Sequence, residues 1–192
     1  LIGWAPLMEY IELSPWLLEF LRSDAYHTWG VHSFYGFAAL LLDDISPRGA
    51  DILAWILTLC ATGVFVWIWH RHTWAPGTRW WDMTMAATLT AGLLISPHLF
   101  TYDLMLWLLP LAIVWRHYAG SRPNMILDGG KLLVATFLVC VAAFASSYIS
   151  LLQLTVSSWL ALPEMAIQIS VPCLVLWIVV VVKQAGPPPV SG

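Results

Sequence analysis

Residues 51–70 read DILAWILTLCATGVFVWIWH, and this run decides the fold. It carries one acidic residue, Asp51, at its start, and about 20 mostly apolar residues are what an α-helix needs to cross a bilayer. No alternation of polar and apolar residues points to strands, and in lipid a helix satisfies its own backbone hydrogen bonds. The sequence therefore predicts an all-α, polytopic transmembrane bundle of about five spans. The further runs that approach the required length are 81–97, 99–116, 132–153 and 164–182.

The composition of the whole chain favours the same location. Of its 192 residues, 60% are hydrophobic and 10% are charged, and a soluble fold of this size could not hide so much apolar surface from water. The 13 tryptophans suit membrane–water interfaces, where Trp concentrates. A net charge of −3 provides no basic field that would attract nucleic acid. Cys60, Cys140 and Cys173 lie inside apolar runs without CxxC spacing, so we interpret them as small core residues.

The distribution of Lys and Arg predicts the orientation. Most of these residues fall in the loops 71–80 and 116–131 and in the tail from Lys183, whereas Arg22 and Arg48 fall on the other side. The positive-inside rule places the richer side in the cytoplasm. The N-terminus then lies outside the membrane and the C-terminus lies in the cytoplasm.

Three regions follow from this pattern. Residues 1–50 form extracytoplasmic and interfacial segments: 7–21 has the spacing of an amphipathic helix, and 34–42 is too short to cross, which favours a re-entrant or interfacial segment. Residues 51–183 form the transmembrane bundle, and the Pro/Gly-rich residues 184–192 predict a disordered cytoplasmic tail. Because the first residue is not Met and no signal peptide precedes the first apolar stretch, we expect a longer protein whose N-terminal half is missing here.

The junction SPHLFTYD at residues 96–103 is the most informative stretch for chemistry. Pro97 must end or kink the helix before it, because proline lacks an N–H and clashes with the preceding turn. The apolar run after the junction has twelve residues, which rise about 18 Å against a hydrocarbon core of about 30 Å. The helix must therefore begin near Leu99, which places Asp103 at or below the outer lipid boundary, where an ionisable side chain needs a polar partner or cavity.

Two interpretations of this junction stay open. In one, Asp103 complements a helix dipole, Tyr102 anchors at the interface and His98 is a solvated turn residue. In the other, the three side chains converge on a polar site, where His98 and the helix N-terminus contact a phosphate. No metal site is indicated, because His70 and His72 do not share a helix face and have no carboxylate or Cys beside them.

The order Ser-Pro-His-x-x-x-Tyr-Asp, followed by an apolar run with Pro110, resembles the C-terminal half of glycosyltransferase family 87, whose members have the GT-C fold. The stretch from Trp4 to Leu18 resembles the family's Trp-x-x-x-Tyr-Leu region. Ser33-Phe34-Tyr35-Gly36 resembles its Asn-Gln-Ser-Leu-x-Gly element, with Val31 and His32 in place of the Asn and Gln. The resemblance covers about residues 1–118.

This resemblance implies a mannosyltransferase of a bacterial plasma membrane that uses polyprenyl-phosphate-mannose as its donor and needs no cofactor. A lipid or glycan acceptor would attack the anomeric carbon with inversion on the extracytoplasmic face. The family's proposed base, an Asp after the first span, lies outside this chain, so the fragment alone is expected to be inactive. The residues implied in binding the donor and its phosphate are His98, Tyr102, Asp103, Ser33, Arg22 and Arg48.

Two other functions are compatible with the sequence. A part of a transporter or permease would make use of helices broken by prolines such as Pro97, Pro110 and Pro172. A non-catalytic scaffold subunit of a membrane complex would need helix faces that bind other chains and no chemistry at the junction.

Overall fold

A computed structural model of the chain describes residues 31–71, 76–97, 105–119, 132–142 and 169–186, with isolated positions at residue 130 and before residue 31. No β-strand occurs within these ranges, so the all-α prediction is confirmed. A further apolar helix runs from Leu132 to Ala142. The labelled helices are α2 (Phe34–Leu42), α3 (Pro47–Arg71), α4 (Arg79–Ile95), α5 (Leu108–Ala119) and α7 (Ser170–Ala185).

Helix α3 has the length and composition of a membrane-spanning segment. Its segment Pro47–His70 has 24 residues, and only 11% of its most apolar window is buried inside the protein. A core helix of a soluble protein buries its apolar side chains, whereas α3 leaves large ones exposed along its length, among them Trp55, Leu59 and Trp67. Within the described ranges this is the one helix that is long and apolar enough to cross a membrane.

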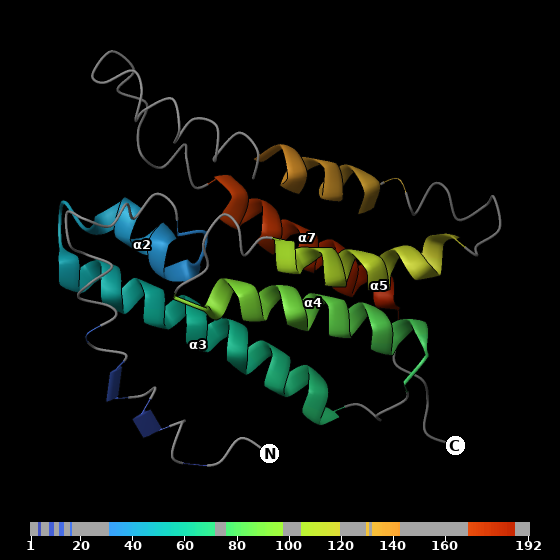
Figure 1. The fold of residues 1–192 in the computed structure, drawn as a ribbon, viewed down its shortest axis with the longest axis horizontal. Helices are drawn as coiled ribbons and strands as arrows, with labels where there is room; N and C mark the ends of the chain where they lie inside the picture. Colours follow the sequence, from blue (N-terminus) through green and yellow to red (C-terminus); the bar gives the residue numbers. More distant parts are fainter. Residues whose placement is uncertain are drawn as a thin grey trace.

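Helix α4 lies at the centre of the bundle. It packs mainly against α7 and α5 and also contacts α3 and α2 (Figure 1). Its buried face carries small side chains, including Ala86, Ala87 and Ala91, which let neighbouring helices approach closely. The largest side chains of the shared core come from both partners, because Met83 and Leu94 of α4 and Trp177 of α7 are fully buried.

The bounds of α4 have local causes. At its start the Thr78 hydroxyl accepts a hydrogen bond from the Trp81 backbone N–H at 3.2 Å, and Asp82 in the first turn complements the helix dipole. At its end the helix stops at Ile95, two residues before Pro97, as the sequence predicts.

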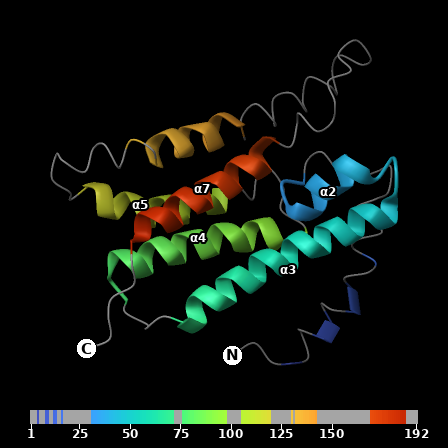
Figure 2. The ribbon, with the colours of Figure 1, turned by 180° about the vertical axis from the view of Figure 1, so that it is seen from behind.

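Helices α2 and α3 form an antiparallel pair. Figures 1 and 2 both show α2 beside the first part of α3, and their residues contact each other. The Phe34–Leu42 run, which was predicted to be a re-entrant or interfacial segment, is a short helix, and the turn after it leads directly into α3.

Four helix ends lie at one end of the bundle: the C-termini of α3, α5 and α7 and the N-terminus of α4 (Figures 1 and 2). This arrangement gathers Arg71, Arg79, Arg116 and Lys183 there. We call it the basic end. The positive-inside rule predicts the cytoplasmic side for these same residues.

Several predicted segments lie wholly or partly outside the residues that the structure describes. The amphipathic segment 7–21 lies almost entirely outside them, as do residues 98–104, where the helix after the junction was expected to begin. Within the described part, a 3₁₀ turn at Met105–Trp107 precedes α5. Helix α7 continues to Ala185, so the first two residues of the predicted tail, 184 and 185, are helical, and residues from 187 onward lie outside the described ranges.

Candidate functional site

A buried polar contact joins the start of α2 to the start of α7. The Nδ1 atom of His32 lies 2.6 Å from the Oγ atom of Ser170, although the two residues are 138 positions apart in the sequence. His32 is 1% exposed and Ser170 is fully buried. Because buried polar groups cost free energy unless they are paired, this contact fixes where the two helix starts meet.

The residues beside His32 begin α2 by a local mechanism. The Ser33 hydroxyl accepts a hydrogen bond from the Gly36 backbone N–H at 3.3 Å and so caps the helix. A Cβ atom at Gly36 would lie 2.1 Å from the carbonyl oxygen of Val31, which no side chain could tolerate without a shift of the backbone. The Ser33–Gly36 element is therefore a tight turn built around a close backbone approach.

The environment of His32 sets its charge. Burial lowers the pKa of the His32 imidazole from its usual 6.5 to about 4, because desolvation disfavours the charged ring. At neutral pH the ring is uncharged, so each nitrogen offers either an N–H donor or a lone pair according to the tautomer. His32 thus acts as a neutral hydrogen-bonding group rather than as a cation that attracts phosphate.

The structure separates the two predicted site residues that it describes. Ser33 lies at the N-terminal end of α2, next to His32, and its side chain is buried. Arg48 is exposed near the start of α3, just beyond the turn that follows the C-terminal end of α2. The nine residues of α2, about 13 Å of helix, lie between these two positions. The other predicted site residues, His98, Tyr102, Asp103 and Arg22, lie outside the described residues.

The first two residues of the predicted junction are described. Ser96 caps the end of α4 through a backbone hydrogen bond to Gly92, and Pro97 follows it. Helix α2 contacts α4, and Figure 1 shows the start of α2 close to the end of α4. Two segments more than sixty positions apart in the sequence, Ser33–Gly36 and Ser96–Pro97, therefore lie at one end of α4, opposite the basic end.

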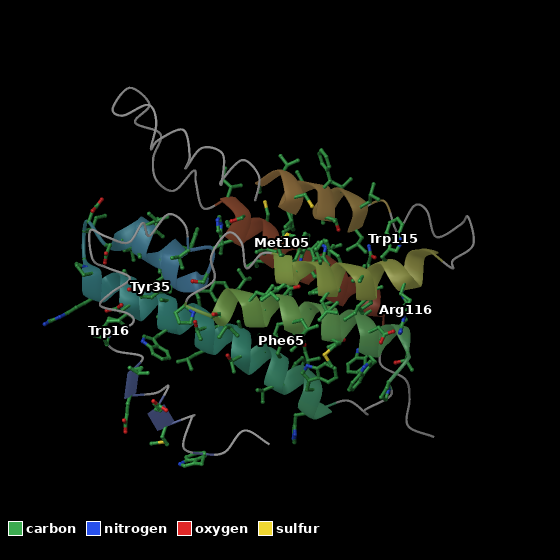
Figure 3. All side chains as sticks on the ribbon, in the orientation of Figure 1. Trp16, Tyr35, Phe65, Met105, Trp115 and Arg116 are labelled. Carbon is green, nitrogen blue, oxygen red and sulfur yellow. The ribbon has the colours of Figure 1, made fainter. Side chains whose placement is uncertain are left out.

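The basic end holds an ion pair between α4 and α5. The guanidinium of Arg116 donates a hydrogen bond to the carboxylate of Asp82, and Figure 3 shows Arg116 at the end of α5 near the start of α4. Asp82 is 7% exposed, so its charge requires such a partner. This pair holds the two helix ends together.

Three tryptophans pack beside that ion pair. Trp69 near the end of α3 makes edge-to-face contacts with Trp80 and Trp81 of α4, with ring centroids 5.7 and 4.9 Å apart. Its indole N–H donates to the Thr88 hydroxyl at 2.9 Å. Aromatic contacts of this kind, with one shared hydrogen bond, anchor α3 to α4 at this level.

An open cavity lies between α3 and α4, next to this tryptophan cluster and extending from it toward Thr62 and Ile95. It has a volume of about 680 Å³, and its lining is mostly apolar. Figure 3 shows Phe65 between the two helices, on the cavity wall. The residues that define it best are Phe65, Trp69 and His70 from α3 and Thr88, Gly92 and Ile95 from α4.

Within the described residues no group of three or more His, Cys, Asp or Glu side chains is placed to hold a metal ion. Cys60, Cys140 and Cys173 are all free thiols. The prediction that they are small core residues is wrong for Cys60 and Cys140, which are exposed on their helices, whereas Cys173 is partly buried against the core.

Two of these contacts are not predicted from the sequence. The His32–Ser170 contact joins residues from distant apolar stretches, and its only signal is a histidine directly before an apolar run. The Asp82–Arg116 pair has a clearer signal, because Asp82 is an acid among the basic residues of the predicted cytoplasmic side. Comparison with protein families, with curated proteins and with solved structures gives no match to this chain.

Proposed function

We propose that the chain is the C-terminal part of a polytopic membrane glycosyltransferase, which transfers mannose from polyprenyl-phosphate-mannose to a lipid or glycan acceptor. In this proposal α3, α4, α5, the helix from Leu132 and α7 belong to five spans of a bacterial plasma membrane. The end of α4 at Ile95 faces outward, and the basic end faces the cytoplasm. The clustering of Arg71, Arg79, Arg116 and Lys183 at one end supports this orientation.

One observation carries the catalytic proposal. Ser33–Gly36 and Ser96–Pro97 belong to two separate elements of the resemblance to glycosyltransferase family 87, and both lie at the end of α4 opposite the basic end. An enzyme that binds a lipid-linked sugar needs such elements together, because binding groups act only when they are positioned around one substrate.

The proposed reaction is a single displacement. The acceptor hydroxyl attacks the anomeric carbon of mannose, a carboxylate takes its proton, and the bond to the phosphate oxygen breaks with inversion. Polyprenyl phosphate then leaves with the bonding electrons. The proposed role of His98 is to bind this phosphate, with Tyr102 and Asp103 orienting it, while Ser33 and the tight turn at Gly36 shape the wall of the site.

The experiment measures transfer of radiolabelled mannose from polyprenyl-phosphate-mannose in membranes that contain the full-length protein. We expect His98→Ala to lower the rate at least tenfold, because a lost donor to a developing phosphate charge typically costs 10²–10³-fold in rate (~3 kcal/mol). His117→Ala, at the basic end of α5, is the matched control and should leave the rate unchanged.

The two outcomes that would count against the proposal differ. Unchanged transfer in the His98→Ala protein would refute the site. Wild-type membranes that transfer no more mannose than membranes lacking the protein would refute the function.

A second function has one observation in its favour. Helix α2 is a short helix that does not cross the bundle, and its N-terminus, with buried His32, is turned toward α4 and α7. Short or broken helices that end at a polar site are typical of transporters. Solute flux in proteoliposomes without any transfer of mannose would favour a permease.

A further inference from the structure

The cavity between α3 and α4 extends from the end of α4, at Ile95, toward the basic end. It follows the C-terminal half of α3, from Thr62 to His70, and none of its lining residues has a role in the proposed transfer of mannose. Eight residues of helix rise about 12 Å, close to the ~15 Å depth of one leaflet of a ~30 Å hydrocarbon core. The cavity therefore has the length of the hydrocarbon chain of a lipid from a single leaflet.

The cavity is open at Gly92 because glycine has no side chain. At Gly92 a Cβ atom would meet nothing within 4 Å, so the α4 wall is open at this position. The volume of about 680 Å³ falls within the range of sites that take small molecules, about 300–1,000 Å³. Phe65, Val66 and Ile95 supply an apolar lining, which is continuous with the exposed apolar surface of α3.

The two ends of the cavity differ in polarity. Trp69, held by Thr88, forms the part of the wall nearest the basic end, and His70 lies next to it. Arg71 follows His70 in the chain, and Arg79 begins α4 at the same end of the bundle. A hydrocarbon chain in the cavity would therefore carry its polar headgroup toward a cluster of positive charge.

The charge at this end favours an anionic headgroup. Asp82 is the acid of the first turn of α4, and it is paired with Arg116. This pairing removes a carboxylate that would otherwise repel an anion. Basic residues near a membrane surface attract acidic lipids, by about fivefold in affinity for each Lys or Arg.

We infer that the α3–α4 cavity binds one acyl chain of an anionic glycerophospholipid from the cytoplasmic leaflet, with its headgroup at the basic end, beside His70 and Arg79. The inference rests on the membrane topology of the proposed function and not on glycosyl transfer. Helices α3 and α4 contact each other much less than α4 and α7 do. The bound lipid would fill the space left between α3 and α4 and would hold α3 to the bundle.

The test uses the full chain in nanodiscs that contain phosphatidylglycerol with a photoactivatable diazirine in its acyl chain. Phosphatidylcholine with the same diazirine chain, at the same mole fraction, is the headgroup control. After irradiation, mass spectrometry locates the lipid adducts. We expect adducts on residues 62–70 and 88–95, at least fivefold more abundant with phosphatidylglycerol than with phosphatidylcholine.

Gly92→Leu should reduce these adducts at least fivefold, because the new side chain fills the open wall. Gly63→Leu is the matched control, since Gly63 also has open space around its Cβ position but does not line the cavity. Thr62→Trp fills the cavity from the α3 side and should reduce the adducts as Gly92→Leu does. The second variant keeps the test valid if one of the two proteins fails to fold.

Several results would overturn the inference. Equal labelling of the wild-type and both filled variants would exclude the cavity as the site. Equal labelling of the exposed residues 52–59 and of the cavity would show that the lipid contacts the apolar surface of α3 without a specific site. Equal labelling by the two headgroups would exclude recognition of the negative charge. None of these results depends on mannose transfer, so failure here and failure of the proposed enzyme remain separate.

Discussion

Replacement of His32 by Gln tests the buried contact between α2 and α7. Gln keeps a hydrogen-bonding side chain of similar length but cannot take up a proton. In the wild-type protein, burial lowers the pKa of His32 from 6.5 to about 4. The unfolded chain therefore takes up a proton at His32 below pH 6.5, while the folded chain does so only near pH 4. Acidification across this window favours the unfolded state.

The size of the effect follows from the pKa difference. Each tenfold difference in proton affinity corresponds to about 1.4 kcal/mol, so a fall from 6.5 to about 4 corresponds to about 3 kcal/mol. The full stabilisation is present above pH 6.5 and is lost progressively as the pH falls to about 4. The Gln variant lacks this dependence, so the difference in stability between the two proteins should change by about 3 kcal/mol over that range.

The assay is an unfolding titration with a denaturing detergent in mixed micelles, followed by circular dichroism, at several pH values from 7.5 to 4. Carboxylates elsewhere also titrate in this window, and taking the difference between the two proteins removes their contribution. His70→Gln, at an exposed histidine, is the control and should follow the wild-type curve. Parallel curves for the wild-type and His32→Gln proteins from pH 7.5 to 4 would refute the reasoning.

Two further predictions concern packing. Gly36→Ala should lower the free energy of unfolding by about 1–3 kcal/mol, because its Cβ would lie 2.1 Å from the Val31 carbonyl oxygen; Gly63→Ala, with nothing within 4 Å, should instead raise helix stability by up to ~1 kcal/mol. The same titration at pH 7.5 compares them, and equal effects would contradict the assigned close approach. Arg116→Ala should cost about 1–2 kcal/mol, because the buried Asp82 carboxylate loses its partner, and the Asp82→Asn/Arg116→Ala double variant should recover most of that loss. A double variant no more stable than Arg116→Ala would show that the ion pair is not the cause.

The fold class could be predicted from the sequence because apolar runs and breaking residues act locally. The helix at residues 51–70 and the stop before Pro97 follow from composition and from the missing N–H of proline, and the structure confirms both. Helix α3 begins at Pro47, four residues before the predicted start at residue 51. The prediction used only the apolar run, whereas proline is favoured in the first turn of a helix. Five spans stay a prediction, since α3 is the one described helix of sufficient length and apolarity.

The candidate site could be predicted only in part, because its contacts depend on the arrangement of the helices in space. Ser33 was singled out by a family resemblance, yet its hydroxyl caps α2. Its neighbour His32 makes the long-range contact, with Ser170, a residue that no local pattern selects. Arg48 was selected as one of the basic residues predicted to lie outside the membrane, but α2 holds it apart from Ser33.

The central position of α4 has a consequence for the order in which the protein assembles during synthesis. About 75 residues of chain lie between the end of α4 at Ile95 and the start of α7 at Ser170, and at about 5–20 residues per second the ribosome needs roughly 4–15 s to make them. During that interval the small-residue face of α4 has no α7 to cover it. The Asp82 carboxylate lacks its ion-pair partner for a shorter time, until Arg116 is synthesised. We therefore expect α3 to enter the membrane independently and α4 to remain at the insertion machinery until its later partners arrive.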